Sequence, residues 1–408
     1  MHSMTKGPAK AMSAGQLFGD AYRTLTDKEL IETLLLEGFA YDADSDAARA
    51  EARDALDCWL ASGLASRRSD RGALFDPVEV MYHATICGVS GEDDFWDRCF
   101  VSTLRRFVTD LEQERPTSIQ MTYHRRFDMS RTPAGSTRRL RMPLPLTQRY
   151  ARLEIRPELP EQASTHRLSD GRLEARVTAT EAPEITLGAK LEFEVLPKAD
   201  QTPPEGDLYL RAREGLVVIT PQVDALARHL AGINAPPEAA VRAFWDHLID
   251  NFVFNPVHYD QIPPDAPLDW VLESGVYDCQ LAAALLVGLC RSQGINGRMV
   301  GGNFLYRRSP TNHFWAEIWL DNSGWTPFDF ISWDLSRGGE DSHWRDRFFG
   351  RIEPRLITEC LPGSFTGAIG VPIPPAWHML RTIKGAGVEI QLTGLDGDCV
   401  YRDDIVRL

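Results

Sequence analysis

The chain of 408 residues lacks the features that would tie it to a membrane. It has no run of 18 or more apolar residues, and residues 1–10 lack the apolar stretch of a signal peptide. Basic residues are also few, because 44 Lys and Arg against 58 Asp and Glu give a net charge of −14. Nucleic-acid binders usually show the opposite, basic balance. We therefore expect no membrane and no nucleic acid as a partner.

Cysteine is sparse, and its spacing excludes two common kinds of site. The seven cysteines are scattered, and none forms a Cys-x-x-Cys pair. They are Cys58, Cys87, Cys99, Cys279, Cys290, Cys360 and Cys399. An odd and scattered set argues against a disulfide framework and against a zinc ribbon. We expect a cytoplasmic protein with reduced thiols, with no metal and no other cofactor.

The residue pattern that is present divides the chain into four regions. The composition, 43% hydrophobic and 25% charged, is normal for a globular protein, and the length suggests two or three domains. The regions are a flexible N-terminus (1–20), a helical region (21–113), an antiparallel β-domain (116–212) and a catalytic domain (216–408). The helical region is predicted from apolar residues at helical spacing, and the β-domain from alternation with a period of two.

Individual elements can be predicted within these regions. Thr26 and Glu29 have the spacing of a capping box, and helices are predicted at 44–62 and 95–111. Pro143 and Pro145 indicate that their strand lies at a sheet edge. In the last region we predict helices at 221–230 and 236–252 and one that follows Asp278, then strands at 299–306, 313–320 and 324–330. Short strands are predicted at 388–392 and around residue 400.

Cys279 stands where a helix is predicted to begin. Asp278 can cap that helix, and Leu281, Leu285 and Leu289 supply its buried side. A thiol in the first turn lies at the positive end of the helix dipole, which we expect to lower its pKa and favour the thiolate. The main-chain N–H of Cys279 is in a position to donate to an oxyanion. One position therefore offers both a nucleophile and half of an oxyanion hole.

A histidine and a carboxylate follow at suitable spacing. His313 opens an alternating strand, and Asn322-Ser323-Gly324 favours a tight turn into the next strand. A hairpin centred on that turn is predicted to set Asp329 beside His313. A thiol needs a proton acceptor, and an imidazole acceptor is oriented by a carboxylate. The sequence therefore predicts that Cys279, His313 and Asp329 form one site.

These elements resemble the core of the transglutaminase-like superfamily. The likeness rests on a Cys that opens a helix ending in R-x-x-G-I (Arg291 to Ile295), then H-x-W-A-E-I-W-L (His313 to Leu320), then Gly-Trp-x-x-x-Asp (Gly324 to Asp329). The resemblance implies an α+β fold, with a papain-like transglutaminase core preceded by the antiparallel β-domain and the helical N-terminal region. It also implies Cys279 as nucleophile, His313 as base and Asp329 as the orienting acid. Residues 117–196 look, more weakly, like the β-rich region of some bacterial relatives.

Other site residues remain candidates at this point. In the family the second oxyanion donor is a side chain upstream of the cysteine, and Trp245, Tyr259 and Gln261 are the candidates here. Gln280-Leu281-Ala282-Ala283 departs from the small or acidic polar residues common there, so the family's specificity does not carry over. Trp315 and Trp325 are core or cleft-wall aromatics that are also candidates for stacking on substrate. Eight arginines and one acid lie between His124 and Arg152, where Arg138, Arg139 and Arg141 are candidates for binding an acidic partner or phosphate.

Three functions are compatible with this sequence. The first is a hydrolase that forms an acyl-enzyme thioester on Cys279 and cleaves a peptide or amide bond. The second is an acyltransferase that passes an acyl group to an amine, taking it from a thioester on an acidic carrier protein. The third is a non-catalytic binding or scaffold protein on the same fold, which the presence of all three residues disfavours.

Overall fold

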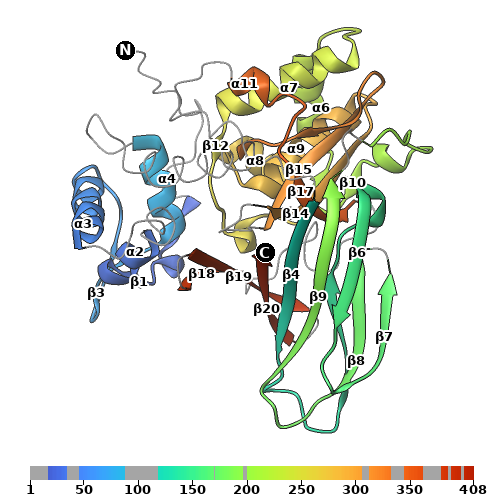
Figure 1. Ribbon diagram of the computed structural model, residues 1–408. Helices are drawn as coiled ribbons and strands as arrows, with labels where there is room; N and C mark the ends of the chain where they lie inside the picture. The colour runs from blue at the N-terminus through green and yellow to red at the C-terminus, as the bar shows by residue number, and fades with distance from the viewer. Residues whose placement is uncertain are drawn as a thin grey trace.

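The computed structural model describes residues 17–34, 46–87, 118–169, 171–195, 200–305, 312–331, 344–361, 378–384, 387–396 and 399–408. Within them helices and antiparallel sheets occur in separate parts of the chain, which is an α+β fold (Figure 1). No helix in the described ranges is long and apolar enough to cross a bilayer.

The N-terminal region combines three helices with a small sheet. Its helices are α2 (Asp27–Leu34), α3 (Asp46–Ala61) and α4 (Pro77–Cys87), and its strands are β1 (Leu25–Thr26), β2 (Arg67–Ser69) and β3 (Gly72–Phe75), in the order β1-β3-β2. The capping box is formed, because the Thr26 N–H donates to Glu29 at 2.8 Å and the Glu29 N–H to Thr26 at 3.3 Å. The predicted helix at 44–62 is confirmed as α3, whereas the one at 95–111 lies outside the described residues.

The end of the stretch predicted to be flexible, residues 1–20, packs against the rest of the structure. Leu17 and Phe18 are buried, with about 4% of each residue exposed. They pack against Tyr82 of α4 and against Val253 and Val276, which belong to the region predicted as the catalytic domain. Residues 1–16 lie outside the described ranges.

The β-domain is a pair of packed sheets. The larger sheet contains β4 (Ser118–Asp128), β9 (Glu184–Val195) and β6 (Tyr150–Glu158), paired in the order β4-β9-β6. The smaller sheet contains β5 (Thr137–Pro143), β8 (Arg172–Thr178) and β7 (Ala163–Ser169), paired in the order β5-β8-β7. Alternate residues of the two sheets, among them Met121, Leu140, Leu173 and Leu187, form one apolar core. β5 is an edge strand, as the prolines predicted.

The C-terminal strands belong to the β-domain, although residues 216–408 were predicted to form one catalytic domain. β18 (His378–Lys384), β19 (Gly387–Asp396) and β20 (Cys399–Arg407) join the larger sheet, whose order is β18-β19-β20-β4-β9-β6. β20 runs antiparallel to β4, with Tyr401 opposite Phe127. A buried ion pair fixes this contact, because Arg125 donates to Asp403 at 2.6 and 2.7 Å. The end of the predicted catalytic domain is therefore part of the preceding domain's sheet.

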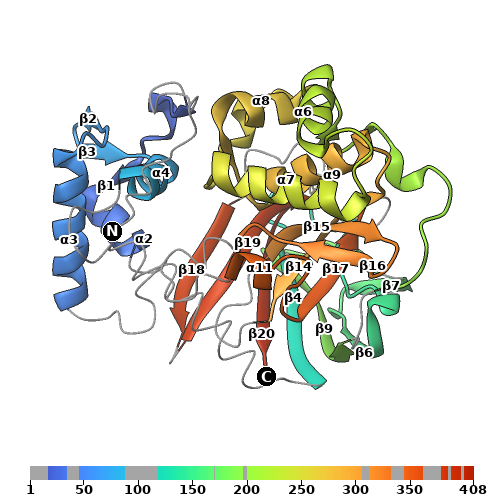
Figure 2. The same ribbon diagram turned by 90° about the horizontal axis from the view of Figure 1, so that it is seen from above.

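The core domain consists of a helical layer and a four-stranded sheet. The helices are α6 (Pro221–Ala231), α7 (Pro237–Asn251), α8 (Pro267–Ser274) and α9 (Cys279–Ser292); a short α11 (Trp344–Arg347) follows later. The sheet has the order β16-β15-β14-β17, from β14 (Gly297–Phe304), β15 (Asn312–Leu320), β16 (Gly324–Phe328) and β17 (Arg355–Cys360). Figure 2 shows α6, α7 and α9 grouped on one side of these strands.

Helix α9 is the centre of this domain. All residues from Gln280 to Arg291 are buried, and its apolar side chains join those of α6, α7, α8 and β15 in one cluster. An apolar surface all round is typical of a helix enclosed by its neighbours. The helix thus holds its N-terminus, with Cys279, in a fixed place above β15.

Candidate active site

Asp278 begins α9 and places Cys279 in its first turn. The Asp278 side chain accepts a hydrogen bond from the Leu281 N–H at 3.0 Å, so the predicted cap is confirmed. It also accepts from the Tyr259 hydroxyl, whose oxygen lies 2.9 and 2.8 Å from its two carboxylate oxygens. Burial raises the pKa of Asp278 to about 6, although these hydrogen bonds and the nearby His313 act in the other direction.

The Cys279 thiol lies between the helix start and strand β15. Its side chain is partly exposed, and the backbone N–H groups of Phe314 and Gln280 are close enough to lower its pKa. Burial outweighs them and raises the pKa of Cys279 well above the ordinary value, and the Asp278 carboxylate adds to the increase. The expectation of a lowered thiol pKa is therefore wrong, because the loss of water around the sulfur exceeds the effect of the helix terminus. At neutral pH the resting thiol is protonated.

His313 and Asp329 are in contact, as the hairpin predicted. β15 and β16 pair from Leu320 opposite Gly324 to Ala316 opposite Phe328, so Asp329 follows the last pair. The His313 Nε2 lies 2.9 and 3.0 Å from the two Asp329 oxygens, which leaves Nδ1 for another partner. Both side chains are buried, at 5% and 1% exposure. The backbone N–H of Phe314, the residue after His313, lies beside the Cys279 thiol, and the charge of Asp329 adds to the rise of the thiol pKa, so the three predicted residues lie in the same part of the core domain.

Arg355 and Glu353 complete a buried charge cluster that the sequence did not reveal. Arg355 lies 2.6 Å from Asp329 and 2.8 Å from Glu353. Burial alone would raise the pKa of Asp329, but His313 and Arg355 lower it to about 2. Asp329 is therefore ionised at any physiological pH. The only signal in the sequence was a Glu-x-Arg pair entering a predominantly apolar strand.

An aromatic ring joins the histidine to this arginine. Phe304 stacks on His313, with ring centroids 4.5 Å apart, and the Arg355 guanidinium lies 4.6 Å from the Phe304 centroid. Phe304 is itself buried. The imidazole is thus held by Asp329 at one nitrogen and by Phe304 on one face, which restricts its rotation.

Two glycines of β14 allow the strands to approach closely enough for this. Gly302 pairs with His313 on one side and with Ile357 of β17 on the other. A Cβ at Gly302 would lie 1.8 Å from the carbonyl oxygen of Leu356, and one at Gly301 would lie 2.5 Å from the Phe314 ring. Any side chain there would push β17 or Phe314 away, so these glycines keep Arg355 within reach of Asp329.

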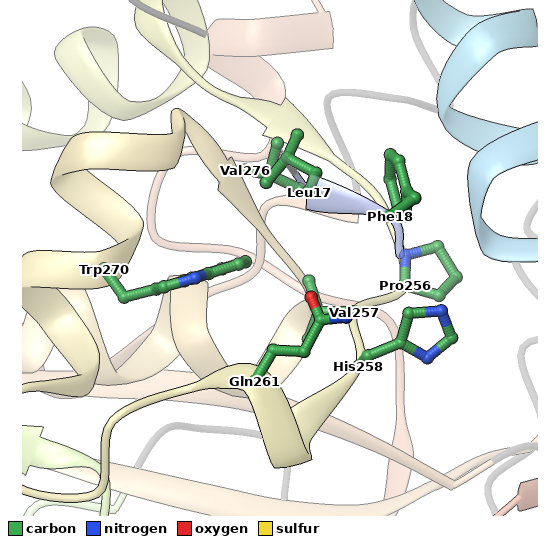
Figure 3. Close-up of a pocket in the computed structure, with 8 residues that line it drawn as sticks. All are labelled: Leu17, Phe18, Pro256, Val257, His258, Gln261, Trp270 and Val276. Carbon is green, nitrogen blue, oxygen red and sulfur yellow. The ribbon is translucent and has the colours of Figure 1, made fainter. Parts of the chain in front are cut away.

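The three candidates for the second oxyanion donor have different surroundings. Tyr259 lies nearest to the required place, because its hydroxyl contacts Asp278 and the Cys279 thiol contributes to the strong rise of its pKa, after burial and Asp278. Trp245 is wholly buried and packs against Phe328 and Phe330 in the core. Gln261 lines a small cavity on the side of the N-terminal region (Figure 3). The geometry favours Tyr259.

The two tryptophans proposed as substrate contacts are buried instead. Trp315 is wholly buried, and its ring lies 4.9 Å from the Arg355 guanidinium. Trp325 is 2% exposed, lies 4.0 Å from the Arg298 guanidinium, and donates its indole N–H to Thr202 at 3.0 Å. Neither ring is available to stack on a substrate. Both rings are therefore core aromatics, the first of the expectations for them, because alternation along a strand does not distinguish a cleft wall from the buried face of a sheet.

The predicted arginine-rich stretch separates into buried and exposed parts. Arg125 is buried against Asp403, and Arg149 is buried against Glu317. Arg138 lies on the same face of β5 as the buried Leu140 and Met142, so it does not share a face with Arg139 and Arg141. Arg139 and Arg141 lie on the outer face of β5 and remain candidates. Among the residues that the structure describes, no group of three or more His, Cys, Asp or Glu side chains could hold a metal ion.

A protein-family model matches part of this chain. Residues 224–330 match the model of the Transglutaminase-like superfamily, a segment that includes Cys279, His313 and Asp329. Among the curated proteins compared, none matches the chain significantly.

Two solved structures resemble the fold at low identity. A candidate cysteine protease from Cytophaga hutchinsonii is 13% identical, with a TM-score of 0.43, and the match covers 72% of this chain and 92% of that one. The periplasmic domain of TgpA from Pseudomonas aeruginosa is 18% identical, with a TM-score of 0.32, and the match covers 59% of this chain and 96% of that one.

Proposed function

We propose that this chain, a member of the transglutaminase-like superfamily through its residues 224–330, is an acyl-transfer enzyme that forms a thioester on Cys279. The observation that carries the proposal is the arrangement around His313: Asp329 holds its Nε2, and the thiol lies beside the next residue, Phe314. A base held by a carboxylate next to a thiol is the arrangement that cysteine acyl transfer requires.

The protonated resting thiol determines how the reaction starts. Because the pKa of Cys279 is raised, the proton has to leave the sulfur as the sulfur attacks the substrate carbonyl. His313 accepts that proton, and the ionised Asp329 stabilises the imidazolium. The Cys279 N–H at the start of α9 is a donor suited to the oxyanion, and the Tyr259 hydroxyl, whose one proton is donated to Asp278, becomes the second donor when it turns from Asp278 toward the substrate. His313 then returns the proton to the leaving amine or thiol, and the acyl-enzyme thioester remains.

Water is our first choice as the group that resolves the thioester. Water is the acceptor that needs no binding site of its own, and the nucleophile is carried by a partly exposed residue. The proposed activity is therefore hydrolysis of a peptide or amide bond in a reducing, cytoplasmic setting. We expect the wild type to cleave peptide or amide substrates from a fluorogenic library. C279A should retain less than about a thousandth of that rate, on the scale of losing a catalytic nucleophile.

Equal rates for the wild type and C279A would contradict the proposal and favour the scaffold function. An added primary amine separates hydrolysis from transfer. If hydrolysis is the function, the acyl group is released as the free acid whether or not the amine is present. If transfer is the function, the acyl group is released as the amide of the added amine.

The outer face of the smaller β-sheet favours amide formation as a second candidate function. Its register sets Arg139 opposite Arg176, and Arg141 opposite Glu174, which in turn faces Arg167. Like charges directly opposite each other destabilise a sheet, so an anionic partner would relieve a cost that this face carries. Thioester carrier proteins are usually acidic, and such a carrier is the acyl donor that this face would suit.

Two thioester substrates test this second candidate. R139Q/R176Q should slow turnover of a thioester on an acidic carrier protein by about tenfold or more, and leave a small soluble thioester unaffected. R156Q/R228Q removes two arginines that are 68% and 66% exposed elsewhere, and it is the matched control. Equal effects of R139Q/R176Q on both substrates, or none on either, would exclude the carrier.

A further inference from the structure

The N-terminal region contacts the loop that leads to the nucleophile. Tyr22 stacks on the His258 imidazole, with ring centroids 3.6 Å apart and planes 11° from parallel. The His258 Nε2 lies 2.9 Å from an Asp76 oxygen, and the Tyr22 hydroxyl donates to Asp260. Asn255, at the start of the loop, donates to the carbonyl of Val78 at 3.2 Å. The two regions therefore meet through several directed contacts.

Apolar side chains surround these polar contacts. Leu17 and Phe18 face Val257 and Trp270 across a small cavity, with His258 at its edge (Figure 3). Phe18 also lies with its ring edge-on to His258, 6.4 Å between centroids. The imidazole is thus enclosed by side chains of the N-terminal region, and 15% of the side chain remains exposed.

Asp76 has a geometry that suits a fixed partner for this histidine. Its side chain is fully buried. One oxygen accepts from the Val78 N–H at 3.0 Å, as a cap of α4, while the other receives His258. An ordinary cap would leave its second oxygen to solvent, whereas this one is aimed at a residue of the core domain. Helix capping therefore explains the contact of one Asp76 oxygen, and the contact of the other oxygen with His258 needs a separate explanation.

The next residue along the loop leads to the thiol. His258 occupies the N-cap position of the short 3-10 helix η6 (Tyr259–Gln261), and its carbonyl accepts from the Gln261 N–H at 3.0 Å, so a held His258 fixes the start of the turn that carries Tyr259. The Tyr259 hydroxyl binds both oxygens of Asp278, which begins α9 immediately before Cys279. Contacts therefore lead from Tyr22 and Asp76 to His258 and from Tyr259 to Asp278 beside the nucleophile, and the backbone between His258 and Tyr259 joins the two sets.

We propose that the N-terminal region is a positioning element for the reactive site, in which His258, held between Tyr22 and Asp76, fixes Tyr259 against Asp278 and the thiol. The loop from Asn255 to Pro264 contains three prolines and only one turn of 3-10 helix, so it has few internal hydrogen bonds to define its shape. Contacts from outside the loop have to supply that definition. This inference rests on the proposed acyl transfer where it is tested through kcat. Its second test, the alkylation rate of Cys279, does not depend on that function.

A double-mutant cycle between His258 and Tyr259 tests the inference. If His258 acts through Tyr259, H258A and Y259F should each lower kcat about tenfold with KM changed less than twofold. H258A/Y259F should then be no slower than Y259F alone. H258Q, which keeps a donor toward Asp76, should recover part of the loss. His229, exposed on α6, gives the matched control, and H229A should leave kcat unchanged.

A second measurement needs no substrate. The rate at which iodoacetamide alkylates Cys279, followed by intact mass, should change by the same factor in H258A, Y259F and the double variant. Multiplicative effects in the double variant, or no effect of H258A, would overturn the inference. A wild type without turnover but with this alkylation pattern would instead contradict the proposed function and leave the inference standing. Y22A, which removes the ring stacked on His258, provides the same test if H258A does not fold.

Discussion

Two buried charge clusters lie on strand β15, four residues apart, and they differ in composition and in what they hold. Around His313 lie Asp329, Arg355 and Glu353. Around Glu317 lie Arg149 of the β-domain and Arg298 of β14, and Arg298 also pairs with Asp200 at 3.0 Å. Alternation places His313 and Glu317 on the same face of the strand.

The difference lies in which groups can change their charge. Burial alone would raise the pKa of Glu317, but Arg149 and Arg298 hold it below its ordinary value. That cluster therefore keeps fixed charges throughout the physiological range and joins the β-domain to the core. The first cluster contains an imidazole with one nitrogen unbound by Asp329, beside a thiol. Under the proposed function, similar buried ion pairs thus serve proton transfer at one end of the strand and domain attachment at the other.

The largest expected effect comes from the carboxylate of the first cluster. D329N should lower kcat by about 10³–10⁴, because an amide no longer selects the imidazole tautomer or stabilises the imidazolium. The measurement is kcat for the most active substrate, with folding checked by circular dichroism. D321N, at an exposed aspartate that accepts a bond from Trp319, is the control and should keep the wild-type kcat. A D329N enzyme within tenfold of the wild type would remove the functional distinction between the two clusters.

The second cluster should respond in stability rather than in rate. E317Q removes the buried carboxylate that Arg149 and Arg298 share and leaves them only Asp200, so we expect a loss of about 3–5 kcal/mol in the free energy of unfolding. Chemical denaturation measures this loss, and kcat of the folded fraction should stay within about threefold of the wild type. A large fall in kcat without a loss of stability would show that this cluster belongs to the reactive site.

Arg355 should affect both properties to an intermediate degree. Because the folded pKa of Asp329 is lowered from 3.8 to about 2, its stabilising effect is present above about pH 4 and is lost as pH falls toward 2. R355M removes one of the two cations responsible, so acid unfolding should begin at a higher pH, while R355K should resemble the wild type. An acid transition in R355M that coincides with that of the wild type would contradict the assigned contact.

The smallest expected effect concerns Asp278. Its folded pKa is raised from 3.8 to about 6, so the folded protein should lose stability as pH rises from about 4 to about 6. D278N should lack this dependence. It should also alkylate a few-fold faster at Cys279 at pH 8, because the charge that raises the pKa of the thiol is gone. Thermal melting from pH 4 to 7 measures the first effect, and alkylation rates measure the second. If D278N loses stability between pH 4 and pH 6 as the wild type does, the pH dependence belongs to another group.

The sequence predicted the parts of the site that depend on local pattern. Asp278 is a helix cap, and the turn at Asn322–Gly324 sets the hairpin register, so Cys279 and the contact of His313 with Asp329 could both be read from short segments. Arg355 could not, because it reaches Asp329 only through the pairing of β17 with β14. The same limit explains the C-terminal boundary. Tyr401 pairs with Phe127, and no local pattern links strands that lie so far apart along the chain.

Intact-protein mass spectrometry after mixing with an activated acyl ester tests the central claim most directly. The account predicts one added acyl group on the wild type, mapped to Cys279, stable to acid and removed by neutral hydroxylamine, as a thioester is. C279S should lack the hydroxylamine-labile adduct, and D329N should acquire it far more slowly than the wild type. Acylation that maps to Cys290 or Cys360, or that proceeds equally fast in D329N, would contradict it.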